Sequence, residues 1–159
     1  MELPSGSTFR FGCDSSEERE KMPKPKVLII DDEQEFASTL SKRLVFRGFD
    51  SLAVFHAEHA LSSIAEEHPE VVLLDLGLEG ISGMDMLRAI RASGTDCVVI
   101  VLTGVADDHV FREAGEAGAA DVLIKPIDID LLVECINRAH SENDRKRWHF
   151  PNRRADGSQ

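Results

Sequence analysis

Residues 98–102 read VVIVL, a stretch in which every side chain is apolar. Since side chains alternate between the two faces of a strand, such a stretch fits a strand that is covered on both faces, as in a parallel sheet between layers of helices. Similar short stretches recur along the chain, at residues 27–30, 52–55, 71–74 and 122–124. The stretch at 52–55 is the weakest, as an edge strand would be. Together they predict a parallel sheet.

Each apolar stretch is followed by apolar residues at helical spacing, which predicts a helix after every strand. In the second of these helices the apolar residues at helical spacing are Ala57, Leu61 and Ile64. Helix start and stop signals support the other helices. Gly48 stands where the first helix should end, and Ser82 with Asp85 resembles a capping box for the third. Asp128 stands at the expected N-cap of the last helix. The sequence therefore predicts five βα units in one doubly wound α/β domain.

The composition limits what the chain does. Its 159 residues and 42% hydrophobic content suit one ordinary globular domain. The formal net charge of -11 repels phosphate backbones and anionic membranes, so we expect protein partners or cations, no direct DNA binding and no membrane. The three cysteines lie far apart in no C-x-x-C pattern, which fits a reducing cytoplasm. The N-terminus lacks an export signal, so we expect a cytoplasmic protein.

The two ends differ in composition from the middle of the chain. Residues 1–25 are rich in Ser, Glu, Lys and Pro and are predicted to form a flexible leader. Residues 26–141 hold the predicted domain, and residues 142–159 form a polar, basic tail. Within that tail, residues 145–154 surround Trp148 with basic side chains. A solvated tail is the simpler interpretation, and contact with an acidic partner or a membrane surface is the alternative.

Polar residues stand where the predicted strands end. Asp31 and Asp32 follow the first stretch, Asp75 the third, Thr103 the fourth and Lys125 the fifth. Ligands of open parallel sheets bind at the carboxyl ends of the strands, so these side chains should meet in one pocket. Taken singly, each acid could instead stand after its strand because it caps the helix that follows. Three converging carboxylates, however, repel one another unless a cation neutralises them, and oxygen ligands favour Mg²⁺.

A carboxylate cluster with a hydroxyl and a lysine also suits phosphoryl transfer. One carboxylate attacks, Mg²⁺ bridges it to the phosphoryl oxygens, and the Thr103 hydroxyl and the Lys125 ammonium orient and neutralise the remaining charge. Asp75 is the predicted nucleophile because it stands alone at the end of a central strand, whereas Asp31 and Asp32 are paired like metal ligands.

Four motifs together resemble those of the response-regulator receiver family of two-component signalling: VLIIDDE (27–33), VVLLDLGLEGISGMDML (71–87), VVIVLTG (98–104) and DVLIKPID (121–128). The resemblance implies a flavodoxin-like (βα)5 three-layer sandwich with strand order 2-1-3-4-5. It implies that Asp75 accepts a phosphoryl group from a histidine kinase or phosphotransfer protein, and that Asp31, Asp32 and the backbone carbonyl of Gly77 hold Mg²⁺ with it. Thr103 would move toward the phosphoryl group and Lys125 would supply its counter-charge, followed by a cis peptide bond.

The resemblance also implies how such a receiver signals. Phosphorylation would change the protein-binding surface of a stand-alone, chemotaxis-regulator-like protein that acts on a downstream protein target without an attached effector. In the family, partners bind, or two phosphorylated copies dimerise, through the face of the fourth helix, fifth strand and fifth helix. Here that face would include residues 107–117, 122–124 and 130–139.

Two residues depart from the family's pattern. Glu79 stands where many relatives have proline, and Val122 stands where most have an aromatic switch residue. An interaction module that keeps the receiver fold but signals without phosphorylation is therefore the alternative function. A metabolic hydrolase is the second rival, but it needs another acid two residues after the nucleophile, where Gly77 stands. We therefore expect a signalling protein and not an enzyme.

Overall fold

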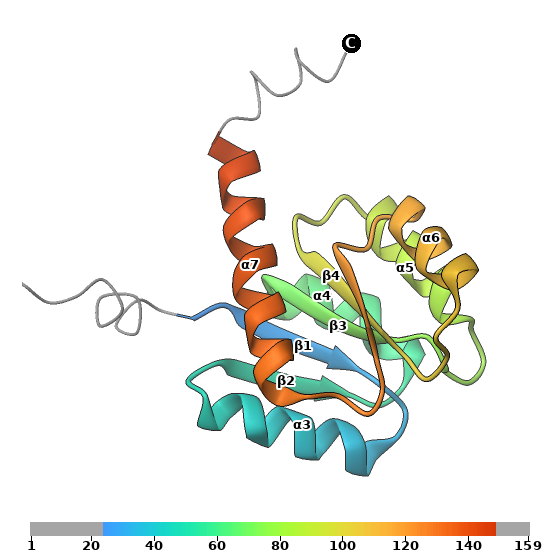
Figure 1. Ribbon diagram of the computed structural model, residues 1–159, viewed down its shortest axis with the longest axis horizontal. Coiled ribbons are helices and arrows are strands. Elements are labelled where there is room, and N and C mark those ends of the chain that lie inside the picture. Colours follow the sequence, from blue (N-terminus) through green and yellow to red (C-terminus); the bar gives the residue numbers. More distant parts are fainter. Residues whose placement is uncertain (1–23, 149–159) are drawn as a thin grey trace, which may run out of the picture.

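The computed structural model describes residues 24–148, and the side chains up to residue 143. All but the last two residues of the predicted leader lie outside the described residues, and so do the side chains of the basic block at 145–154. Along the described chain, strands and helices alternate (Figure 1): β1 (Lys26–Ile30), α3 (Gln34–Phe46), β2 (Asp50–Val54), η1 (Ala57–His59), α4 (Ala60–Glu67), β3 (Val71–Asp75), α5 (Gly83–Ala92), β4 (Val98–Thr103), α6 (Asp108–Glu116), β5 (Asp121–Ile124) and α7 (Ile129–Trp148).

The five strands form one parallel sheet in the order β2-β1-β3-β4-β5. This is the flavodoxin-like order that the resemblance to the receiver family implied, and the weakest apolar stretch, at residues 52–55, contributes to an edge strand. The order reverses direction between β1 and β3, which leaves a crevice at the carboxyl ends of these two strands. The sheet therefore presents its ligand-binding edge where Asp31 and Asp75 lie.

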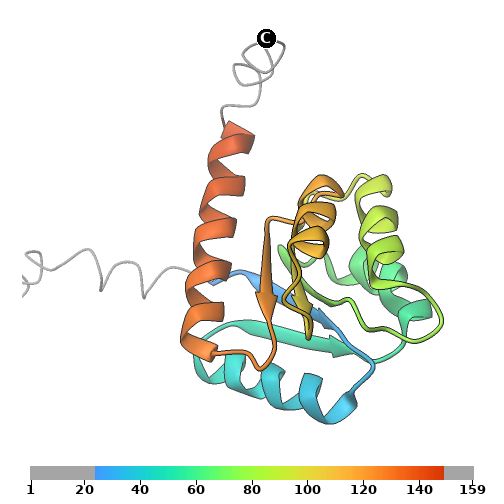
Figure 2. The same ribbon diagram turned by 45° about the vertical axis from the view of Figure 1, so that its right-hand side comes forward.

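Two apolar clusters fill the space on the two faces of the sheet. On β3, Val71 and Leu73 belong to the cluster beneath α3 and α7, whereas Val72 and Leu74 belong to the cluster beneath α4, α5 and α6. Figure 2 shows α7 on one side of the sheet and α5 and α6 on the other. Every residue of β3 and β4 is buried. This double coverage is the physical reason for the unbroken apolar stretches in the sequence.

The helix boundaries follow the predicted capping signals. The Ser82 hydroxyl accepts a hydrogen bond from the N–H of Asp85 at 3.1 Å, as in a capping box. The Asp128 carboxylate accepts the N–H of Asp130 at 2.9 Å and caps α7. Gly48 follows the end of α3 with φ of 93°, a left-handed conformation that glycine adopts without steric cost. These three predictions are confirmed.

The second βα unit differs from the prediction in two respects. Strand β2 covers Asp50–Val54, so it begins before the apolar stretch and ends before Phe55. Leu61, one of the apolar residues that indicated this helix, is 41% exposed, whereas Ala60 is fully buried. Residues 57–59 form a 3-10 turn, which has three residues per turn and so rotates α4 relative to a continuous α-helix.

The last helix continues to Trp148, into the segment predicted as a polar tail. Within this helix, the Asn143 side chain donates a hydrogen bond to the carbonyl of Asp96 at 3.2 Å, which ties this part of α7 to the segment before β4. None of the helices among residues 24–148 is both long and apolar enough to cross a membrane.

Candidate phosphorylation and metal site

Three polar side chains are buried at the carboxyl edge of the sheet, on strands that are neighbours. Asp31 directly follows β1, Asp75 ends β3 and Thr103 ends β4. Their exposed fractions are 0%, 6% and 4%, and no other polar or charged residue in the described part of the chain is as buried. Burial of polar groups costs free energy, and these three polar side chains lie together at one edge of an otherwise apolar sheet.

The structure brings together the three predicted metal-binding acids. Asp31, Asp32 and Asp75 each offer a carboxylate oxygen, and these oxygens lie within 4.8 Å of one another. Asp32 is half-buried, so the group opens toward solvent on its side. A compact set of oxygen ligands with access to water suits Mg²⁺, which keeps several water ligands and takes one or two carboxylates. The donor set therefore fits the predicted ion.

Lys125 reaches this group from the end of β5. Its Nζ lies 3.1 Å from Asp31 Oδ2, 3.3 Å from Asp75 Oδ1 and 3.5 Å from Glu33 Oε1. The same ammonium lies 4.4 Å from the centre of the Phe36 ring. The peptide bond between Lys125 and Pro126 is cis, as the resemblance implied. Lys125 is thus held beside Asp75, where it can neutralise an added phosphoryl group.

The charges of the site are unbalanced. Burial raises the pKa of Asp31 above its ordinary value, and the charge of Asp75 adds to this, while the Glu33 N–H and Lys125 act in the opposite direction. Burial by itself would lower the pKa of Lys125, but the carboxylates of Asp31 and Asp75 outweigh it and raise that pKa. One lysine therefore faces several carboxylates that repel one another, and a bound cation would relieve this repulsion.

The loops beside the site are hydrogen-bonded to its acids. The Gly77 N–H donates to Asp75 Oδ1 at 3.1 Å, and the Glu79 N–H donates to Asp32 Oδ2 at 2.8 Å. The Thr103 hydroxyl oxygen accepts the N–H of Val105 at 3.1 Å, which leaves its own proton available for donation. The hydrogen bond of Gly77 places this residue next to the predicted nucleophile, and the role of its carbonyl as a metal ligand stays a prediction.

Sequence reasoning missed several residues that shape the site. Phe36 and Glu33 were not among the predicted site residues, although both contact the Lys125 ammonium. Gly83, the first residue of α5, lies so close to Asp75 and Leu76 that a Cβ atom would meet their backbone. No signal in a single sequence marks such a close approach, because it depends on how α5 packs against the end of β3.

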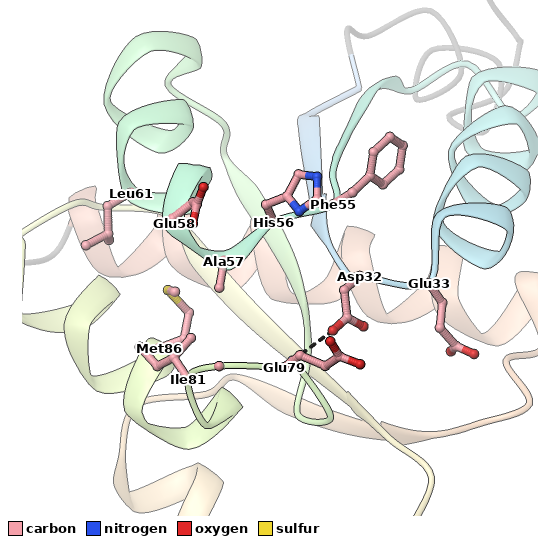
Figure 3. Close-up of a pocket in the computed structure, with 11 residues that line it drawn as sticks. Asp32, Glu33, Phe55, His56, Ala57, Glu58, Leu61, Glu79, Ile81 and Met86 are labelled. Carbon is pink, nitrogen blue, oxygen red and sulfur yellow. Dashed lines mark hydrogen bonds between the residues drawn. The ribbon is translucent and has the colours of Figure 1, made fainter.

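A cavity of about 770 Å³ adjoins the predicted metal-binding acids (Figure 3). Its lining includes the acidic side chains of Asp32, Glu33, Glu58 and Glu79, the imidazole of His56, and apolar residues such as Leu61. Because Asp32 belongs both to the cavity and to the carboxylate group, the cavity is continuous with the predicted metal site.

Comparison with known proteins agrees with this geometry. Residues 27–137 match the family model of the response regulator receiver domain. Over 114 residues the chain is 34% identical to the regulatory protein AtoC of Escherichia coli, an alignment that covers 72% of this chain and 25% of AtoC. It is also 34% identical over 112 residues to the two-component response regulator PhoP of Pseudomonas aeruginosa, covering 70% of this chain and 50% of PhoP.

Solved structures show the same similarity. One is the crystal structure of a response regulator protein from Burkholderia pseudomallei with a phosphorylated aspartic acid, calcium ion and citrate. It is 28% identical, with a TM-score of 0.67, over 77% of this chain and 72% of that chain. The chain belongs to the response-regulator receiver family, whose members are phosphoryl-accepting modules of two-component signalling. It spans half or less of the length of the two curated relatives named above.

Proposed function

We propose that Asp75 is the residue that accepts the phosphoryl group, from a phosphohistidine of a sensor kinase or phosphotransfer protein. A carboxylate oxygen of Asp75 would attack phosphorus, the N–P bond would break, and the histidine would leave with the electron pair of that bond. The observation that carries this assignment is the contact of Asp75 with Lys125 at 3.3 Å, within a group that also includes Asp31 and Asp32.

The neighbouring residues have distinct proposed roles. Asp31, Asp32, Asp75 and the Gly77 carbonyl would hold Mg²⁺, which when bound neutralises charge on the phosphoryl oxygens. Lys125 would form an ion pair with the transferred group. The Thr103 O–H would donate a hydrogen bond to a phosphoryl oxygen once that oxygen is present.

We further propose that the chain signals through protein contacts in the cytoplasm and is not a metabolic enzyme. Gly77 provides no general acid beside Asp75, and the net charge of -11 favours protein partners over DNA. Cys97 and Cys135 are free and buried, which suits a reducing compartment. The face of α6, β5 and α7, which includes the exposed Ile124, is the proposed contact surface for a downstream target or a second phosphorylated copy.

The assignment of Asp75 is tested with acetyl phosphate. The wild-type protein should gain one phosphoryl group in the presence of Mg²⁺ and none after chelation, as measured by intact-mass spectrometry. Asp75→Asn should gain none, because an amide oxygen is a far weaker nucleophile than a carboxylate. Asp50→Asn, which changes an exposed acid at the opposite end of the sheet, is the matched control and should be phosphorylated normally. Phosphorylation of Asp75→Asn would refute the assignment.

A further inference from the structure

The three metal-binding acids are held in place in two different ways. Asp31 Oδ1 accepts the N–H of Glu33 at 2.9 Å, and Asp75 Oδ1 accepts the N–H of Gly77 at 3.1 Å. Both donors lie two residues after the acid they hold, so these contacts form wherever the strand ends in this local turn. Asp32 Oδ2 instead accepts the N–H of Glu79, which is 47 residues away in the sequence. The position of Asp32 therefore depends on the loop between β3 and α5.

The Glu79 contact has a geometry suited to orienting a metal ligand (Figure 3). At 2.8 Å it is a short, charge-assisted hydrogen bond to one carboxylate oxygen, which leaves the other oxygen available to a cation. Asp32 is less buried than Asp31 and Asp75, so packing restrains its side chain less. Without the Glu79 N–H, its carboxylate would sample more rotamers, and binding would have to order it.

The side chain of Glu79 has less influence than its backbone. Residue 79 is exposed, so water and salt screen its carboxylate from an ion in the site. Its N–H, by contrast, contacts a metal-binding acid directly. Backbone and side-chain effects are separable by substitution, because only proline removes the N–H, whereas glutamine and alanine keep it.

We propose that the backbone N–H of Glu79 is a positioning group for the divalent ion, which it serves by orienting Asp32. The inference rests on the proposed Mg²⁺ site. Hydrogen-bond partners of metal ligands commonly contribute about 10-fold to 100-fold in metal affinity. The bond also links the loop between β3 and α5 to the metal site, so that a bound ion restrains the loop through Asp32.

The experiment compares the Mg²⁺ dissociation constants of four proteins by isothermal titration calorimetry. Glu79→Pro should bind Mg²⁺ about tenfold more weakly than wild type. Glu79→Gln and Glu79→Ala, which keep the N–H, should stay within about threefold, because they change only a screened charge. Thermal melting without metal should be similar in all four proteins, since position 79 lies in an exposed loop. Equal weakening in the proline and glutamine variants would overturn the inference in favour of charge.

A second measurement reports the hydrogen bond itself. Amide hydrogen exchange at Glu79 should be slow in the wild-type protein and should become fast in Asp32→Ala, which removes the acceptor. Fast exchange at Glu79 in the wild type would overturn the inference even if the affinities changed. Failure of the wild-type protein to bind Mg²⁺ at all would instead refute the proposed metal site, and the inference with it.

Discussion

Gly83, beside the site, has no space for a side chain. An ideal Cβ atom at this position would lie 2.8 Å from the carbonyl oxygen of Asp75 and would clash with the Cα atom of Leu76. Both neighbours are backbone atoms, so a new methyl group cannot be accommodated by rotation of a side chain. Gly83 therefore allows α5 to begin directly against the segment that carries the predicted phosphoacceptor.

Gly83→Ala is predicted to destabilise the fold and to slow phosphorylation. The added methyl group should displace the backbone at Asp75 and lower the free energy of unfolding by about 2 kcal/mol, a typical cost of overpacking. Urea unfolding and the rate of labelling by acetyl phosphate measure the two effects.

Gly115→Ala is the matched control for this prediction. Gly115 lies within α6 and has no atom within 4 Å of an added Cβ. This variant should gain about 0.5–1 kcal/mol from the higher helix propensity of alanine and should be phosphorylated at the wild-type rate. Equal stability of the two variants would show that α5 has room to move away from β3.

At the scale of elements, the Thr103 hydroxyl is hydrogen-bonded to the segment after β4, whereas the switch position on β5 is occupied by Val122. Thr103 Oγ1 accepts the N–H of Val105, so movement of this hydroxyl toward Asp75 would pull on the loop that leads into α6. On β5, Val122 is half-buried and packs against the apolar cluster beneath α4, α5 and α6. A valine is short and stiff at χ1, so it cannot swing into space vacated by Thr103.

Activation is therefore predicted to change residues 104–109 and α6 more than β5. Amide NMR shifts measured with and without beryllofluoride, a mimic of the phosphoryl group, should be largest in residues 104–109. Thr103→Ala, which removes the hydroxyl, should reduce these shifts. Changes centred on Val122 and larger than those of residues 104–109 would contradict the prediction, because they would show that β5 carries the signal.

At the scale of the whole molecule, binding of the proposed metal ion should be linked to folding. The carboxylates of the site come from two strands and are brought together only in the folded state, where they repel one another. An ion that binds this group but not the unfolded chain stabilises the fold by an amount set by its concentration relative to the dissociation constant. The acid cluster is therefore predicted to make the stability of the domain depend on divalent cations.

Mg²⁺ at about 100 times its dissociation constant is predicted to raise the free energy of unfolding by about 2.7 kcal/mol. For a domain of this size the midpoint of thermal unfolding should rise by roughly 10 °C. Asp32→Ala should lose most of this response because it removes a ligand from the most accessible side of the site. An equal rise in this variant would indicate that Mg²⁺ stabilises the protein elsewhere.

The fold class and the five polar residues at the strand ends could be predicted from the amino-acid sequence. Unbroken apolar stretches identified the strands, and capping signals at Ser82 and Asp128 identified helix starts, because both depend on local periodicity and local hydrogen bonds. The convergence of Asp31, Asp75 and Lys125 also followed from the sequence, since carboxyl ends of parallel strands share one edge.

The contacts that hold these residues in place could not be predicted in the same way, because they form between packed elements. The rotation of α4 that exposes Leu61 results from a 3-10 turn whose sequence also permits a continuous α-helix. The hydrogen bond from Glu79 to Asp32 joins segments 47 residues apart, and the close approach of Gly83 depends on the docking of α5. Such contacts depend on distances between packed elements, which neither residue type nor spacing along the chain specifies.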